Sequence, residues 1–86
     1  MNFIKDYYKK EAQMKKELGM LCREIRERHS LTREQVSDWT GISDKSIMNM
    51  ETKSCVSYDL LLRLFYFYCL KGLVTMEDRA RFEICF

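Results

Sequence analysis

Proline is absent from the sequence, and only three glycines occur among its 86 residues. Because these two residue types build most tight turns, their scarcity disfavours an all-β fold and favours helices. Long apolar runs are also missing, since the longest, over residues 60–70, is too short to span a bilayer and contains Arg63. The first residues carry a charge every few positions and lack the apolar segment of a signal peptide. These absences predict a cytoplasmic helical protein with no membrane partner.

Residues that build active sites and metal centres are also scarce. The four cysteines form no C-x-x-C pair, and the single histidine, His29, is not placed to complete a metal cluster. Free thiols in a reducing cytosol are the simplest interpretation, and a redox or metal role is the alternative. The sequence has no glycine-rich phosphate loop, no Ser–His or Cys–His arrangement and no paired carboxylates in an apolar setting. We therefore expect neither an enzyme nor a bound cofactor or metal.

The net charge of +2 is small and unevenly distributed. Residues 1–30 contain eight basic and five acidic residues, which gives +3, whereas residues 31–56 contain three and four, which gives −1, and residues 57–86 contain four of each. A nucleic-acid-binding protein usually presents a basic face. Charge alone therefore gives weak support for such a function.

Apolar residues in the first segment recur at helical spacings of three, four or seven: Phe3, Tyr7, Met14, Leu18, Leu21 and Ile25. This period predicts a helix that runs almost to Arg28. We allow for a bend or break near Lys16 to Gly19, because glycine in a helix interior costs about 1 kcal/mol relative to alanine. The lysine-rich side of this helix is either a solvated surface or a binding patch.

Two short helices follow. Thr32 and Gln35 have capping-box spacing and predict a helix over about 33–40, with Val36 and Trp39 on its inward side.

A further helix over 44–51 is predicted by its boundaries and its period. Gly41 suits a left-handed residue between the two helices, and Ser43 suits an N-cap. Ile47 and Met50, three positions apart, would form its buried stripe.

Residues 60–70 are apolar and aromatic on nearly all sides, so a strand is an alternative to a helix there. The run is continuous rather than alternating and has no evident partner strand, which favours a helix capped by Ser57. Such a helix is buried on more than one side, against a second molecule or a docked terminal helix. Thr75 then caps a last helix over about 76–85.

Two short helices joined by a glycine-containing turn form a helix-turn-helix. From Leu18 to Gly72, roughly two-thirds of the chain, the sequence resembles the Cro/repressor type, often called the xenobiotic-response-element family. The matching stretches are IRERHSLTREQV, GIS, SIMNME and LLRL, in the family's order and without a gap. The resemblance implies an all-α, compact five-helix domain with an extended N-terminal helix. Its parts would be an N-terminal extension over 1–17, the helix-turn-helix domain over 18–72 and a C-terminal helix over 73–86 as a dimerisation element.

The resemblance also implies an internal ion pair between Arg26 and Glu51, because arginine can bind a carboxylate through two parallel hydrogen bonds. This pair would lock the helix over 44–51 against the first helix. The sequence departs from the family at Arg33, where glutamine is usual, and at Phe65, where alanine is common. The glycine that often follows the glutamate is missing.

The outward residues of the helix over 44–51 have the chemistry to bind base edges. Lys45 suits guanine and Asn49 suits adenine, while Asp44 can accept from cytosine and Met48 can touch a thymine methyl. By matched position in the family, Asp44, Lys45 and Asn49 would face bases. The alternative is that all four are solvent-facing residues of no special function. The candidate base-reading residues are Asp44, Lys45, Met48 and Asn49, and the candidate phosphate-contacting residues are Arg33, Glu34, Thr52, Lys53 and Ser54.

We therefore expect a sequence-specific regulator of transcription, acting as a repressor, that binds an inverted repeat in double-stranded DNA as a homodimer. Small stand-alone members of the family are common in phages and mobile elements. Surplus apolar side chains suggest the dimer interface: Tyr66, Phe67, Phe82 and Phe86. The alternatives are a protein-interaction module or an antitoxin that keeps the fold and acts mainly through a protein partner.

Overall fold

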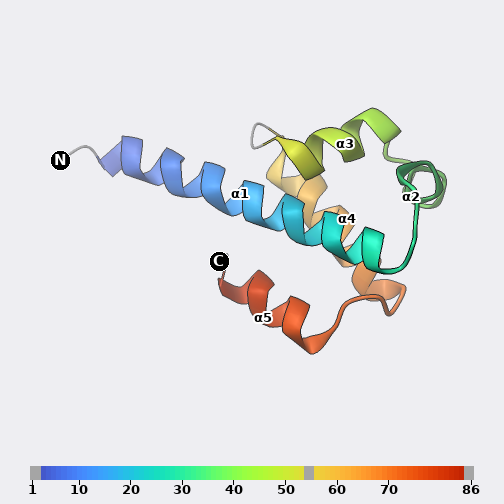
Figure 1. The fold of residues 1–86 in the computed structure, drawn as a ribbon. Helices are drawn as coiled ribbons and strands as arrows, with labels where there is room; N and C mark the ends of the chain where they lie inside the picture. The colour runs from blue at the N-terminus through green and yellow to red at the C-terminus, as the bar shows by residue number, and fades with distance from the viewer. Residues whose placement is uncertain (1–2, 54–55, 85–86) are drawn as a thin grey trace.

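The computed structural model describes residues 3–53 and 56–84, and the regular elements in these ranges are five α-helices (Figure 1). Their bounds are α1 Phe3–Arg28, α2 Arg33–Thr40, α3 Asp44–Thr52, α4 Tyr58–Leu70 and α5 Met76–Ile84. The all-α prediction is confirmed for the described residues, and the alternative of a strand over 60–70 is wrong. That run is a helix because its apolar faces pack against neighbouring helices rather than against a partner strand.

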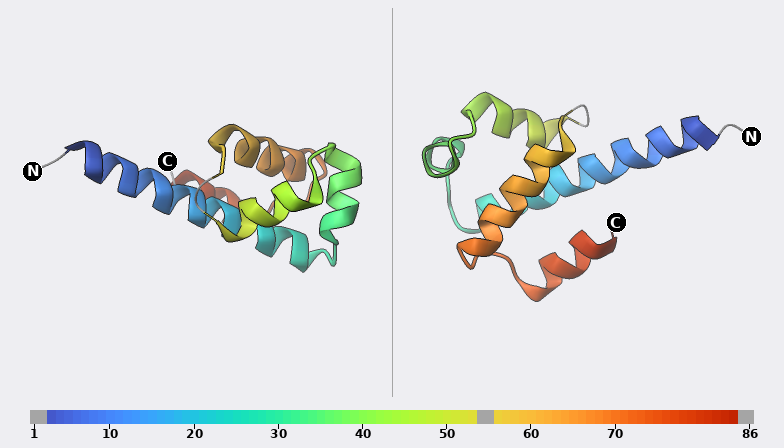
Figure 2. Two further views of the ribbon diagram at one scale, coloured as in Figure 1. Left: turned by 90° about the horizontal axis from the view of Figure 1, so that it is seen from above. Right: turned by 180° about the vertical axis from the view of Figure 1, so that it is seen from behind.

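Helix α1 is the central element, and α3, α4 and α5 all pack against it. In Figure 1, α3 and α5 lie on opposite sides of α1, and its first half extends beyond the other helices; Figure 2 shows the same extension from two further directions. The core lies where α1 meets α3 and α4. Its buried side chains are Leu18, Leu21, Cys22, Ile25, Val36, Ile47, Met50, Leu61, Leu64, Phe65 and Tyr68.

Gly19 does not break α1, which runs as one helix from Phe3 to Arg28. A Cβ atom at this position would lie 2.0 Å from the carbonyl oxygen of Met50 in α3. The glycine is therefore required by close approach of two backbones, not by a bend.

The predicted cap of α2 is present as a reciprocal pair. The Gln35 backbone N–H donates to Thr32 Oγ1 at 3.1 Å, and the Thr32 backbone N–H donates to Gln35 Oε1 at 2.8 Å. Val36 is buried as expected, but the inward placement of Trp39 is wrong, because half of this residue (50%) is exposed. Its ring lies beside Phe67 of α4, at a centroid distance of 6.1 Å, instead of entering the core.

Helix α5 folds back and docks against α1 and α4. Two N–H groups of Arg28 donate to the Asp78 carboxylate at 2.7 and 2.9 Å, and Arg81 pairs with Glu24. The Phe82 ring of α5 stacks on Phe65 of α4 at a centroid distance of 4.3 Å. Part of the apolar surface of α4 is therefore covered within the same chain.

Candidate nucleic-acid interface

The turn between α2 and α3 is fixed by its backbone and by one threonine. Gly41 adopts a left-handed conformation with φ of 75°, and its N–H donates to the Ser37 carbonyl at 2.9 Å. The Thr40 hydroxyl donates to the Val36 carbonyl at 2.8 Å and accepts the Ile42 N–H at 3.1 Å. A residue with a Cβ is strained at such a φ, so glycine suits this position. These contacts fix the direction in which α3 leaves the turn.

Helix α3 is capped by Ser43, whose Oγ accepts the Ser46 N–H at 3.1 Å, and it is held at its other end by an ion pair. Arg26 Nε donates to Glu51 Oε2 at 2.7 Å, and Arg26 Nη2 donates to Oε1 at 3.0 Å. The third contact of this guanidinium is from Nη1 to the Leu31 carbonyl at 2.8 Å. The side chains of Arg26 and Glu51 are only 12% and 1% exposed. The pair that the resemblance implied therefore connects α1, α3 and the loop before α2.

This pair also alters the acid–base behaviour of Arg26. The hydrogen bonds to Glu51 raise the pKa of the guanidinium further above its already high value. Arg26 is therefore a permanent cation, held in place by a carboxylate that has little access to water.

The candidate base-reading residues are not equally accessible. Asp44, Lys45 and Met48 are exposed, and they lie opposite the buried side chains of α3, which are Ile47, Met50 and Glu51. Asn49 is partly buried, and among the described residues its Oδ1 atom has no hydrogen-bond donor. The outer face of α3 is therefore open along its first two turns, whereas the amide of Asn49 is turned partly inward.

The candidate phosphate contacts lie at the ends of α2 and α3. Arg33 Nε lies 3.5 Å from Asp44 Oδ1, which joins the beginnings of the two helices. Glu34 and Lys53 are exposed. Thr52 is also exposed, and its hydroxyl donates to the Met48 carbonyl at 2.7 Å. Ser54 lies outside the described residues.

A polar hollow of about 370 Å³ includes two of these residues, Arg33 and Thr52, in its lining, and sequence reasoning did not foresee it. It is lined by Arg23, Arg26, Leu31, Thr32, Arg33, Glu51 and Thr52. Three arginines and one glutamate give its lining a formal charge of +2. Arg23 is the new member, and its position three residues before Arg26 on α1 is the signal that could have identified it. This hollow contains a basic surplus even though residues 31–56 carry a net charge of −1.

The candidate dimer residues fall into two groups. Tyr66 is exposed on α4. Phe67 and Phe82 are partly buried against the core of the same chain, and Phe82 stacks on Phe65. Phe86 lies outside the described residues.

Asp78 is a buried acidic residue that sequence reasoning missed, with 2% exposure. It accepts two hydrogen bonds from Arg28, and its Oδ2 also accepts the Thr75 backbone N–H at 2.9 Å. These donors, Arg28 above all, hold the pKa of the Asp78 carboxyl well below its usual value. The acid is therefore a structural anchor for α5.

Comparison of the chain with protein-family models, with curated proteins and with solved structures yields no match. Among the described residues, no three His, Cys, Asp or Glu side chains gather as a metal site would require. None of the helices in the described ranges has both the length and the apolar character needed to cross a bilayer.

Proposed function

We propose that the protein is a helix-turn-helix regulator of transcription, of the Cro/repressor type, which binds a specific double-stranded DNA sequence through α3. The observation that carries this proposal is the way α3 is packed and held in the fold. Its inner side is buried, its two ends are fixed by Ser43 and by the Arg26–Glu51 pair, and its outer side is exposed. A helix held rigidly with a polar outer face is what insertion into the major groove requires.

Three exposed residues on this face offer distinct base contacts. Lys45 can donate to guanine O6 and N7, Asp44 can accept from the cytosine amino group, and Met48 can touch a thymine methyl. The proximity of Arg33 to Asp44 orients the carboxylate at the first turn of α3. Asn49 must rotate its side chain to present both amide atoms to adenine, and its buried Oδ1 lacks a donor that would oppose this rotation.

Phosphate binding is assigned to the basic hollow beside α3. Arg23 and Arg33 line it, and the exposed Lys53 follows α3 in the chain. Contacts of this kind set the position and much of the affinity on DNA, but carry no sequence information. We infer moderate affinity for one protomer, and a homodimer on an inverted repeat would raise it through avidity.

Titrations on two duplexes test the proposal, with the preferred sequence first selected from random DNA. Asn49→Ala and Lys45→Ala should each reduce the preference for the selected duplex over a scrambled one by about 1–3 kcal/mol. Lys53→Ala and Arg23→Ala should weaken binding to both duplexes, and each should flatten the slope of log affinity against log salt by about one unit.

Lys9→Ala is the matched control, since Lys9 is an exposed lysine on the first half of α1. Lys9→Ala should change neither the preference between the two duplexes nor the slope of log affinity against log salt. Wild-type protein that shows no preference for any selected sequence would refute the proposal.

A protein-interaction function is the second candidate, either as an adaptor or as an antitoxin with a toxin partner. Exposed apolar residues on α2 and α4 favour it, because contiguous apolar surface often marks a protein contact. The DNA titrations separate the two candidates.

A further inference from the structure

Helix α4 leaves a line of large apolar side chains in solvent. Leu62, Tyr66 and Leu70 are all exposed, and they are spaced four residues apart, so they follow one another along one side of the helix. Trp39 of α2 is exposed beside them. Soluble monomers rarely leave such a row uncovered.

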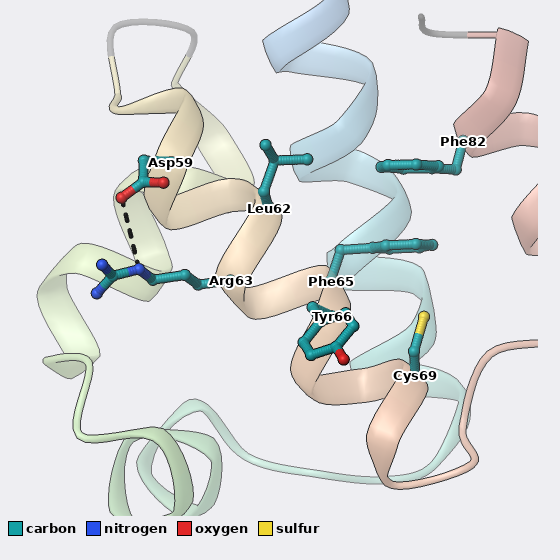
Figure 3. Close-up of a pocket in the computed structure, with 7 residues that line it drawn as sticks. All are labelled: Asp59, Leu62, Arg63, Phe65, Tyr66, Cys69 and Phe82. Carbon is teal, nitrogen blue, oxygen red and sulfur yellow. Dashed lines mark ion pairs between the residues drawn. The ribbon is translucent and has the colours of Figure 1, made fainter.

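Two hollows flank this row. One, of about 460 Å³, lies between α4 and α5, with Leu62, Phe65, Cys69 and Phe82 in its lining. In Figure 3 the parallel rings of Phe65 and Phe82 form one side of it, and the side chain of Tyr66 projects from the same stretch of α4.

The other hollow, of about 290 Å³, lies between α4 and α2 and is lined by Trp39, Ile42, Phe67 and Leu70, among others. Tyr66 and Arg63 line both hollows. Tyr66 therefore stands on a ridge with a groove on each side.

We propose that this ridge packs antiparallel against the same ridge of a second copy of the chain, with the two-fold axis at Tyr66. In an antiparallel helix pair centred on residue 66, the residue four positions before the centre faces the residue four positions after it. Leu62 of one copy would then face Leu70 of the other, and each Tyr66 would enter the groove beside the other. A two-fold contact requires one surface to be its own complement, and a ridge between two grooves has this property.

Charge complementarity supports a second copy as the occupant. Asp59 lies at the start of α4 and Lys71 directly after its end. Antiparallel packing brings the Asp59 end of one helix to the Lys71 end of the other. The two Asp59 residues stay apart, since they are separated by fourteen residue steps, or about 21 Å along the helix axis. Each Asp59 would then lie between Arg63 of its own chain, 3.5 Å away, and the Lys71 end of the other copy.

This inference rests on the proposed function in that the dimer would present two α3 helices to an inverted repeat. It extends the sequence prediction, because Leu62 and Leu70 join Tyr66 on the ridge, whereas the partly buried Phe67 and Phe82 line the two grooves.

Sedimentation velocity over a range of protein concentrations tests the surface. Wild-type protein should be a dimer at tens of micromolar. Tyr66→Glu should weaken dimerisation by a factor on the order of 30 or more, as expected for a central aromatic contact. Tyr7→Glu is the matched control, because Tyr7 and Tyr66 are both 64% exposed, and it should leave the dimer intact. Circular dichroism confirms that each variant is folded.

A mixing experiment tests the register. Leu62→Glu and Leu70→Lys should each be monomeric alone, because each places two charges opposite leucines. An equimolar mixture should recover a dimer, since glutamate at 62 then faces lysine at 70 and the remaining leucines face each other. A mixture that stays monomeric would refute the antiparallel register, and a monomeric wild type would refute the second copy as occupant.

The two proposals fail separately in these experiments. A wild-type dimer that shows no sequence preference on DNA would support the proposed α4 interface and refute the proposed function. A wild-type monomer that still prefers its selected half-site would support the proposed function and refute the α4 interface.

Discussion

Arg26 and Arg28 stand two positions apart on α1, and each donates two hydrogen bonds to a buried carboxylate of another helix. Arg26 is itself largely enclosed, whereas 39% of the Arg28 side chain is exposed. The acceptors differ too, because Asp78 keeps a hydrogen bond from the Thr75 N–H in addition to those from Arg28. The same arginine–carboxylate geometry therefore holds two different helices. The enclosed Arg26–Glu51 pair holds α3, and the partly exposed Arg28–Asp78 pair holds α5.

Truncation of Arg26 should have the largest effect. Arg26→Ala leaves Glu51 buried without its partner, which costs about 3–5 kcal/mol. For a chain of this length the unfolding midpoint should fall by roughly 10 °C or more. Thermal unfolding by circular dichroism measures it, with Arg23→Ala as matched control because Arg23 pairs with an exposed glutamate on the same helix. Equal midpoints for the two variants would show that the enclosed pair contributes nothing.

A substitution at Gly19 should also weaken the contact between α1 and α3. Gly19→Ala places a methyl group where the Met50 carbonyl oxygen lies, so the two backbones must separate. Such overpacking costs about 1–3 kcal/mol, against which alanine recovers up to about 1 kcal/mol of helix propensity. We expect a net loss in the same thermal experiment, with Met20→Ala, at the exposed neighbouring position, close to wild type. A more stable Gly19→Ala protein would contradict the close approach.

Arg28→Ala should destabilise the protein less than Arg26→Ala, because Asp78 retains the Thr75 donor and the site admits water. The acid dependence gives a second measurement. A carboxyl whose pKa is lowered on folding contributes stability above its unfolded pKa of about 3.9, and that stability is lost as pH falls below this value. Because Arg28 is the main cause of the lowered Asp78 pKa, the variant should lose less stability than wild type below about pH 4.

Unfolding midpoints between pH 2 and pH 6 would show this difference. If the midpoints of wild type and Arg28→Ala fell equally as the pH is lowered, Arg28 would not be the main cause of the lowered Asp78 pKa.

The two pairs also show what the sequence could predict. Glu51 lies at a fixed place in a local pattern that begins with Arg26, and the capping residues around it set the bounds of α2 and α3. The Arg28–Asp78 pair depends instead on how α5 folds back after Gly72, and no local pattern encodes that direction. Trp39 was misplaced for a similar reason, since its helical period allowed burial but Phe67 of α4 provided a contact at the surface.

The candidate site divides in the same way. The exposed face of α3 could be predicted, because its buried stripe leaves Asp44, Lys45 and Met48 outward. The inward turn of the Asn49 amide and the basic hollow that includes Arg23 could not, because both depend on tertiary packing, and the hollow is lined by residues of three helices. The role of Gly19 was also hidden, since a helix interior gives no sign of the backbone that crosses it.

Helix α1 is continuous in its backbone, but its two halves should differ in how often they open. Residues such as Ile4, Tyr7 and Tyr8 are exposed on the first half, whereas Leu18 and Ile25 are fully buried on the second. A helical segment with little tertiary packing is only marginally stable, so the amide protons of the first half should exchange with solvent more often, by local fraying. Amides around the buried residues should exchange only when the core opens. A single helix would thus contain hydrogen bonds that exchange by fraying and hydrogen bonds that exchange only when the core opens.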